Sequence, residues 1–212
     1  MADQDAVTRR LPESTRVEGF SDGVFAIALT LLVLNLRAPD TSVAHALLTD
    51  WPVYVAYLAA FLNIAAIWIH HHDLFTRVRR VDARLICANL LLLLIASLFP
   101  WPASVISAAV RSGDRSNEVA ATVLYAAVGF LVPLAWIGLY SYLGRHPRLL
   151  RDETGSAFIR TAIRRALVSV VVYPAAAVLA FVEPVAALVA FAALPLFFIG
   201  TLVFPADSAA SP

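Results

Sequence analysis

A carboxylate interrupts the first long apolar stretch of this sequence. Thr15 and Glu18 fit the T-x-x-E pattern of a capping box, which predicts that a helix starts here. Asp22 then lies about one and a half turns inside the helix, where an ionised carboxylate costs several kcal/mol unless it is paired. Asp22 must therefore face protein or water. Two interpretations stay open: a structural contact between helices, or a direct role in the passage of ions or protons.

Three consecutive histidines close the second apolar stretch and raise the question of a metal site. The run from His70 to His72 is followed by Asp73. Consecutive helix residues point about 100° apart, so these side chains do not converge on one ion, and we expect polar contacts at the helix end instead. Trp68 lies four residues before His72 on the same helix face, from which His72 can reach a carboxylate such as Asp22. We expect Asp22 to contact the second or third apolar stretch of its own subunit, with His72 and Asn89 as its favoured partners.

Two lone amides, Asn63 and Asn89, lie within apolar stretches. In such surroundings an amide more often joins two helices than binds a substrate.

The sequence holds no nucleophile elbow, no HExxH or DxD pattern and no glycine-rich phosphate loop, so we expect no enzymatic activity. Cys87 is the single cysteine, which excludes an internal disulfide and a cysteine-based zinc site.

The elements that position these residues must cross a membrane, because the chain is too apolar for a soluble fold. Hydrophobic residues make up 60% of its 212 residues, and the mean hydropathy is +0.78. Charged residues reach only 15%, against about 25% in soluble domains. A net charge of +1 offers no electrostatic footprint for nucleic acid.

Six apolar stretches are each long enough to cross a hydrocarbon core of about 30 Å as a helix. They predict an all-α, polytopic membrane protein with six transmembrane helices and no separate soluble domain. We expect the six-span domain over residues 16–204, with cytoplasmic tails over 1–15 and 205–212. The stretches cover approximately residues 17–36, 51–71, 85–106, 119–143, 162–182 and 184–204.

Prolines mark several of these stretches. Pro100 and Pro102 break the helical pattern of the third stretch and predict an architectural helix end there. Pro133, Pro174 and Pro195 fall inside the later stretches and predict kinks.

The arginines predict the orientation. Thirteen of the 16 fall on one side of the expected membrane, and the positive-inside rule places that side, with both termini, in the cytoplasm. The opposite side holds only Arg37, Arg111 and Arg115.

Helical geometry divides the first span into two faces. We expect one face to meet helices of the same subunit and the other to meet a symmetry axis or lipid. Asp22 and Thr30 fall on different faces and cannot both line one narrow path along a straight helix. The first face holds Phe20, Gly23, Ile27, Thr30, Leu31 and Leu34; the second holds Glu18, Asp22, Phe25, Leu29 and Leu36.

The segment that opens the first span resembles a signature of the transmembrane protein 175 (TMEM175) potassium-channel family. Residues 16–22 match its RxxxFSD motif through Arg16, Phe20, Ser21 and Asp22. Further likenesses cover residues 16–106: Trp68, His72 and Leu74-Phe75 resemble the end of the family's second span, and Asn89 to Leu93 and Phe99-Pro100 resemble its third. The last three spans match only in number and hydropathy.

The resemblance implies a cation channel whose pore is lined by the first span of each subunit, without a carbonyl filter. Single-repeat bacterial members form tetramers. Carried over by position, the hydrophobic constriction falls on Ile27, a polar layer on Thr30 and a further apolar ring on Leu34. This chain has Ile27 where bacterial relatives often have Leu, so its selectivity can differ. The resemblance also implies a structural and gating network of Arg16, Phe20, Ser21, Asp22, Trp68, His72 and Asn89.

Three hypotheses follow. The first is a homotetrameric, potassium-permeable channel in the plasma membrane of a prokaryote, multi-pass, with lipids and monovalent cations as its partners. It needs no cofactor and no metal beyond transient K⁺ near Thr30. The second is a proton-coupled secondary transporter that uses Asp22 and His72. The third is a non-conducting membrane scaffold. Oligomeric state and reconstituted flux distinguish these hypotheses.

Overall fold

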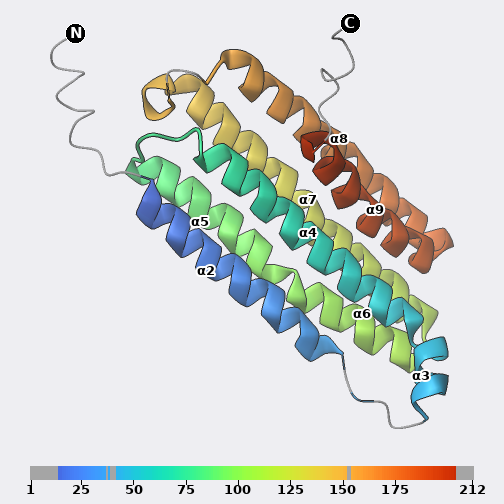
Figure 1. The fold of residues 1–212 in the computed structure, drawn as a ribbon. Coiled ribbons are helices and arrows are strands. Elements are labelled where there is room, and N and C mark those ends of the chain that lie inside the picture. Colours follow the sequence, from blue (N-terminus) through green and yellow to red (C-terminus); the bar gives the residue numbers. More distant parts are fainter. Residues whose placement is uncertain (1–13, 37, 39–41, 152–153, 204–212) are drawn as a thin grey trace, which may run out of the picture.

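The computed structural model of the chain is an elongated bundle of long helices that lie side by side (Figure 1). It describes residues 14–36, 38, 42–151 and 154–203. The expected tails therefore lie almost wholly outside the described residues. The helices are α2 (Thr15–Leu31), α3 (Val43–Thr49), α4 (Trp51–Phe75), α5 (Ala83–Leu98), α6 (Pro100–Ser112), α7 (Arg115–Arg145), α8 (Ser156–Val182) and α9 (Pro184–Val203), with short 3₁₀ segments at η1 (Leu32–Asn35) and η2 (Pro147–Leu149).

The expected all-α, polytopic membrane fold is confirmed. Five helical rods are long and apolar enough to cross a membrane, and a shorter apolar helix covers Pro184–Gly200. The short helix α3, which the sequence pattern did not predict, connects the first two rods. The five long rods are Thr15–Asn35, Trp51–Phe75, Ala83–Ser112, Arg115–Arg145 and Ser156–Val182.

The expected helix end at Pro100 and Pro102 needs correction. The rod continues to Ser112, because both prolines fall in the first turn of a new helix, α6, where proline's missing N–H has no intrahelical partner to lose. Phe99 joins α5 to α6 with helical backbone angles. The prolines therefore divide the third span into two helices. Pro133, Pro174 and Pro195 do lie inside α7, α8 and α9, as expected.

The predicted capping box is also wrong. Helix α2 does start at Thr15, so its N-cap residue is Ser14 and not Thr15. No side chain caps the helix. Ser14 already has helical backbone angles, and its buried hydroxyl donates instead to the carbonyl of Val78, 3.3 Å away in the loop between α4 and α5. This bond ties the start of α2 to that loop.

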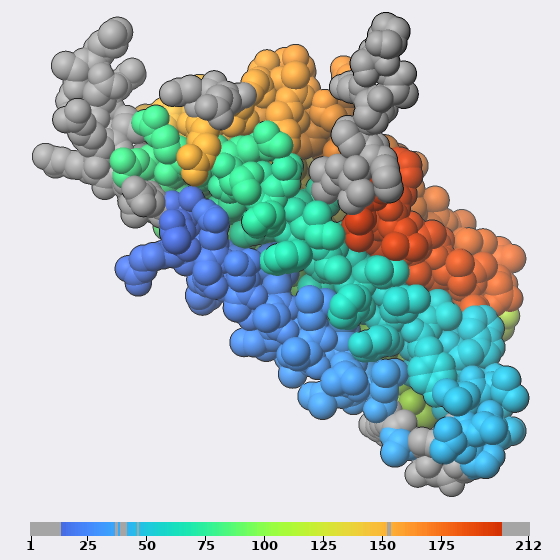
Figure 2. Space-filling model, in the orientation of Figure 1, coloured from blue at the N-terminus to red at the C-terminus, as the bar shows by residue number. Residues whose placement is uncertain are grey.

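Helices α4 and α7 form the middle of the bundle, with α2 along one edge and α8 and α9 along the other (Figure 1). The near face in Figure 2 shows α4 between α2 and α9. Helix α2 packs mainly on α4 and α5. Helix α7 packs on α5, α6 and α8, and α9 packs on α4 and α8. The edge helix α2 is therefore covered from one side only within this chain.

Asn63 joins four helices at the centre of the second half of the bundle. Its amide nitrogen lies 3.2 Å from the Tyr125 hydroxyl of α7 and 3.0 Å from the Phe191 carbonyl of α9. Its amide oxygen accepts a 2.6 Å hydrogen bond from Tyr173 of α8. The expected role of Asn63 in joining helices is confirmed, and these bonds fix the relative positions of α4, α7, α8 and α9.

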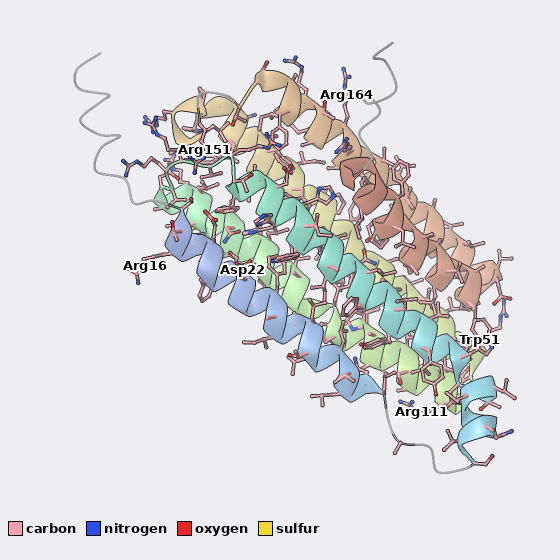
Figure 3. The ribbon with its side chains drawn as sticks, in the orientation of Figure 1. Arg16, Asp22, Trp51, Arg111, Arg151 and Arg164 are labelled. Carbon is pink, nitrogen blue, oxygen red and sulfur yellow. The ribbon has the colours of Figure 1, made fainter. Side chains whose placement is uncertain are left out.

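The two ends of the bundle differ in charge. Arg16, Arg151 and Arg164 lie toward one end, and Arg111 and Trp51 lie toward the other (Figure 3). At the arginine-rich end the α4–α5 loop pairs with the α7–α8 loop through a single bridge between Val78 and Leu150. Positively charged side chains are thus concentrated at the end where the α4–α5 and α7–α8 loops lie side by side.

Asp82 connects two helices, α5 and α7, at the arginine-rich end of the bundle. Its carboxylate accepts hydrogen bonds from the Leu85 amide at 2.9 Å, as the N-cap of α5, and from the Tyr142 hydroxyl at 2.6 Å. Desolvation of the carboxylate acts to raise its pKa, but these two hydrogen bonds and the nearby His146 and Arg148 together hold the pKa of Asp82 below its ordinary value. The carboxylate therefore stays ionised as it joins α5 to α7.

Gly129 allows α7 and α8 to approach closely. A Cβ atom at this position would overlap the ring of Tyr173, whose hydroxyl donates to Asn63. We expect Gly129→Ala to displace that ring, break the Tyr173–Asn63 bond and cost about 1–3 kcal/mol through overpacking. The thermal midpoint of the purified protein in detergent measures the effect.

Gly138 provides the matched control, because it lies on the same helix with open space around the position of its Cβ. Gly138→Ala should leave the midpoint unchanged or raise it, since alanine favours the helix. Equal midpoints for the two variants would contradict the close contact between Gly129 and Tyr173.

Candidate ion-conduction surface

Helix α2 leaves one apolar face exposed in this chain. Ile27 is 61% exposed and Leu34 is 72% exposed; Thr30 between them and Gly23, one turn before Ile27, are exposed as well. Phe20 and Leu31 extend the same face. Every residue that helical geometry assigned to the first face is therefore exposed.

The buried face of α2 is rotated slightly from the second face that helical geometry defined. The side chains that α2 and η1 bury are Ser21, Phe25, Ala28 and Leu32. Asp22 is exposed at the margin of this buried face rather than at its centre. The difference arises because α4 and α5 contact the helix along the line through Ser21, whose small side chain admits close packing.

The Thr30 hydroxyl is held by its own helix. It donates a 2.9 Å hydrogen bond to the carbonyl of Ile27. Because the hydroxyl hydrogen is used in this bond, the oxygen lone pairs remain available on the exposed face. The side chain can therefore offer an acceptor to a cation.

Leu34 lies beyond the α-helix. Helix α2 ends at Leu31, and η1 continues the rod with the tighter winding of a 3₁₀-helix. The Asn35 amide fastens this end by donating to the carbonyl of Pro100, 3.1 Å away at the start of α6. The end of the rod is thus anchored to the third span while Leu34 stays exposed.

Asp22 contacts the second span, as expected, but through Trp68. The Trp68 indole nitrogen donates to Asp22 Oδ1 at 2.9 Å. The prediction of His72 and Asn89 as its favoured partners is wrong. His72 stacks on Trp68 instead, with ring centroids 5.9 Å apart, because the two residues are one helical turn apart and Trp68 is the one level with Asp22.

A second polar contact lies on the buried side of α2. Asn89 of α5 donates to the Ser21 hydroxyl at 3.0 Å, and its amide oxygen lies 2.9 Å from Nε2 of His71. Ser21 in turn donates to the carbonyl of Val17 at 2.8 Å. Ser21, His71 and Asn89 are each at most 1% exposed. Asn89 thus makes the interhelical hydrogen bonds expected of a lone amide in an apolar stretch, and its place in a gating network stays a prediction.

The donors in the hydrogen bonds that connect Ser21, Asn89 and His71 determine where the hydrogen atoms lie. The Ser21 hydroxyl gives its hydrogen to Val17, so its oxygen must accept from the Asn89 amide nitrogen. The Asn89 oxygen then faces His71, whose Nε2 must carry a hydrogen to complete the bond. Helices α2, α5 and α4 are thereby joined without a buried unpaired charge.

His71 is the site residue that sequence reasoning missed. Its ring stacks on Phe75 at 4.2 Å and meets the edge of Phe25 at 5.4 Å. A signal was present, because His71 falls four residues after Ile67 and four before Phe75, both buried. That spacing places it on the core side of α4, whereas His72 is exposed.

The seven residues expected to form one network divide into groups. Ser21 and Asn89 belong to the buried contact, and Asp22, Trp68 and His72 to the exposed one. Arg16 and Phe20 are exposed on α2, and Arg16 forms no ion pair with a described residue. Over the described ranges, no group of three or more His, Cys, Asp or Glu side chains is arranged to hold a metal ion.

Comparison with known proteins connects this geometry to a family. The family model described as endosomal/lysosomal potassium channel TMEM175 matches residues 16–100. A Streptomyces collinus protein named as a potassium channel is 40% identical over 206 residues, covering 94% of this chain and 98% of its own length. A Chamaesiphon minutus protein, also named as a potassium channel, is 34% identical over 66% of this chain and 71% of its own.

A solved structure agrees with these matches. The crystal structure of a lysosomal potassium-selective channel TMEM175 homolog from Chamaesiphon minutus superposes with a TM-score of 0.73 and 26% identity, over 88% of this chain and 96% of that one. The fold is that of a polytopic, all-helical membrane protein, and the relatives that it matches are named as potassium channels. This chain belongs to the TMEM175 potassium-channel family, as its opening motif indicated.

The bond between Trp68 and Asp22 predicts coupled mutational effects. We expect Trp68→Phe and Asp22→Ala each to lower the thermal midpoint. The double variant should be destabilised by less than the sum of the two single effects, because both substitutions remove the same hydrogen bond. The coupling free energy should be about 0.6–1.7 kcal/mol, the range for such bonds between membrane helices.

Trp101→Phe is the matched control, since Trp101 is also exposed and lies on α6, away from Asp22. It should show no coupling to Asp22→Ala. Strictly additive losses for Trp68→Phe and Asp22→Ala would show that the indole–carboxylate bond is not formed.

Proposed function

We propose that this chain forms a homotetrameric, potassium-permeable channel with α2 of each subunit at the axis. The observation that carries the proposal is the exposed face of α2, which places Ile27, Thr30 and Leu34 in one line on a helix that packs from one side only. In a membrane, lipid covers an exposed apolar face as readily as a protein partner does, so the choice of a partner rests on the relatives. The relatives named as potassium channels support a conduction path for potassium, and four copies of the chain around one axis is the assembly that the family resemblance implies.

The proposed conduction path selects ions by desolvation. Four Ile27 side chains around an axis would form an apolar collar from which water withdraws when it narrows, so the gate moves no charge. Four Thr30 hydroxyl oxygens beside it would accept a partly dehydrated cation. Potassium sheds water more readily than sodium, so the collar favours potassium. Leu34 would add a further apolar ring, and K⁺ near Thr30 is the only ion that the mechanism needs.

The alternative, a proton-coupled transporter that uses Asp22 and His72, has weaker support. Trp68 lies between the two residues, bonded to Asp22 and stacked on His72. An indole N–H only donates a hydrogen bond, so it cannot pass a proton between them. We therefore assign Asp22, Trp68 and His72 to holding α2 against α4, which supports the pore helix without lining the path.

The chain would lie in the plasma membrane of a prokaryote with both termini in the cytoplasm. The gathering of arginines at one end of the bundle supports this orientation (Figure 3). In a Cys87→Ser background, Ser42→Cys should be labelled from outside intact cells by an impermeant thiol reagent, and Ser156→Cys should not. Both serines are exposed, at opposite ends of the bundle. The reverse labelling pattern would overturn the orientation.

Ile27 should be the narrowest point of the path. Ile27→Asn would place four amides at the collar, so water would remain and the dehydration barrier would fall. We expect potassium current to rise several-fold and the preference for potassium over sodium to fall toward none. Single-channel recording or liposome flux with each cation measures both changes.

Two variants sharpen this test. Ile27→Val keeps an apolar collar and should keep the preference for potassium. Thr30→Ala removes the acceptor oxygens without widening the collar, so it should weaken selectivity with little gain in current. If Ile27→Asn changes neither property while a substitution on another helix changes both, α2 does not form the pore.

A further inference from the structure

His70, the first histidine of the run, packs against α7 and α9. Its ring makes edge-to-face contacts with Trp136 and Phe198, with centroids 6.3 Å and 6.1 Å apart. His70 lines a cavity of about 490 Å³ whose other walls come from α7, α8 and α9. This volume is within the range of about 300–1,000 Å³ that is usual for small-molecule sites.

Aromatic rings form a continuous wall of this cavity. Trp136 stacks on Tyr140 with centroids 5.3 Å apart, and Tyr140 meets Phe158 of α8 at 6.1 Å. With His70 and Phe198, these three residues give five rings in contact along one line, and all five line the cavity. Aromatic walls pack best against a flat aromatic molecule, by offset stacking and edge contacts.

Three polar side chains of the cavity lack a hydrogen-bond partner among the described residues: His70, Tyr140 and Ser169. Tyr140 is 5% exposed and Ser169 is 7% exposed. Each polar group keeps access to the cavity, because the one enclosed, unpartnered polar atom in the described residues is Nε of Arg77. Hydroxyls and an imidazole can each donate a hydrogen bond, so oxygen acceptors on a ligand would satisfy them.

The two hydroxyls lie at different heights of the cavity. Gly129 lies against Tyr173 and Gly144 against Ile159, so α7 and α8 run side by side in opposite directions. This register places Tyr140 level with about residue 163 of α8, roughly 10 Å from the level of Ser169 at 1.5 Å per residue. A ligand that serves both hydroxyls therefore needs an oxygen at each of two opposite ends.

The charged side chains at the outer end of the cavity already have partners. Arg77 forms a 3.0 Å ion pair with Asp73, and its guanidinium lies 4.3 Å from the centre of the Phe158 ring. Arg165 is engaged as well. An ionised ligand would have to displace these contacts, whereas a neutral ligand leaves them intact.

We infer that this cavity binds a neutral, flat aromatic molecule with a carbonyl oxygen at each of two opposite ends, which is the chemistry of a quinone. The ring lies along Trp136, and the oxygens accept hydrogen bonds from Tyr140 and Ser169, with His70 as a further donor. The site is separate from the proposed pore, and its occupancy does not depend on whether the chain conducts potassium.

Quenching of Trp136 fluorescence tests the inference on the purified full-length protein in non-ionic detergent. The probe is 2,3-dimethyl-1,4-naphthoquinone, whose methyl groups block addition of the Cys87 thiol to the ring. The comparison compound is 1,4-dibromo-2,3-dimethylnaphthalene, which has a similar flat shape and also quenches tryptophan but has no oxygen. We expect saturable quenching by the quinone, most of it lost in Trp136→Phe but not in Trp51→Phe. The brominated compound should bind about tenfold more weakly, because it accepts no comparable hydrogen bond.

Substitutions in the cavity separate hydrogen bonding from shape. Tyr140→Phe and Ser169→Ala each remove one donor with little change of shape. Each should weaken the quinone about three- to tenfold and leave the brominated compound unchanged. Tyr57→Phe is the matched control, since it removes a tyrosine hydroxyl that does not line the cavity, and should leave both affinities unchanged. Ala166→Leu fills the apolar part and should abolish saturable quenching by both compounds.

The thermal midpoint of each variant shows whether it is folded, and the two nearly isosteric variants decide the matter if Ala166→Leu does not fold. Stronger saturable quenching by the quinone, weakened by both Tyr140→Phe and Ser169→Ala, supports the site. Three results would each overturn it: equal affinity for the brominated compound, no greater effect of Tyr140→Phe and Ser169→Ala than of Tyr57→Phe, or quenching that does not saturate. None of these readouts requires ion flux, so a failure here leaves the proposed channel function untouched.

Discussion

Asn89 holds α2 against the bundle, and the rotation of α2 that this contact imposes decides which face of the helix is left exposed. The amide connects Ser21 of α2 to His71 of α4 in surroundings that water does not reach. Any other rotation would leave a buried polar group without a partner, at a cost of several kcal/mol in a membrane interior. Once Ser21 faces inward, Ile27, Thr30 and Leu34 face outward together.

The subunit divides its polar contacts between two centres. Asn89 organises the side that holds the proposed pore helix, and Asn63 organises the side formed by α4, α7, α8 and α9. Each centre relies on one amide because an amide both donates and accepts, and so satisfies several helices without a net charge. Most of the arginines instead gather at one end of the bundle, in and beside the connecting loops.

Errors in the sequence-based expectations arose where a local pattern had more than one structural outcome. Pro100 and Pro102 were compatible with the end of a helix or the start of one, and packing of α6 on α7 favoured the start. The Thr15 and Glu18 pattern predicted the helix start but not its cap, because Ser14 bonds to the distant Val78. His72 was preferred to Trp68 as the partner of Asp22 because spacing gives the shared face of a helix but not the height of a neighbour.

The sequence by itself determined the membrane class, the number of apolar stretches, the family and the line of residues along the outer face of α2. These follow from hydropathy, from an opening motif and from the 100° period of a helix, all of which are local properties of the chain. Only the tertiary structure decided that Asp22 pairs with Trp68, that His71 rather than His72 is buried, and that α4, α7, α8 and α9 enclose a cavity. Those features depend on the relative heights and rotations of helices distant in sequence, and periodicity within one helix carries no information about them.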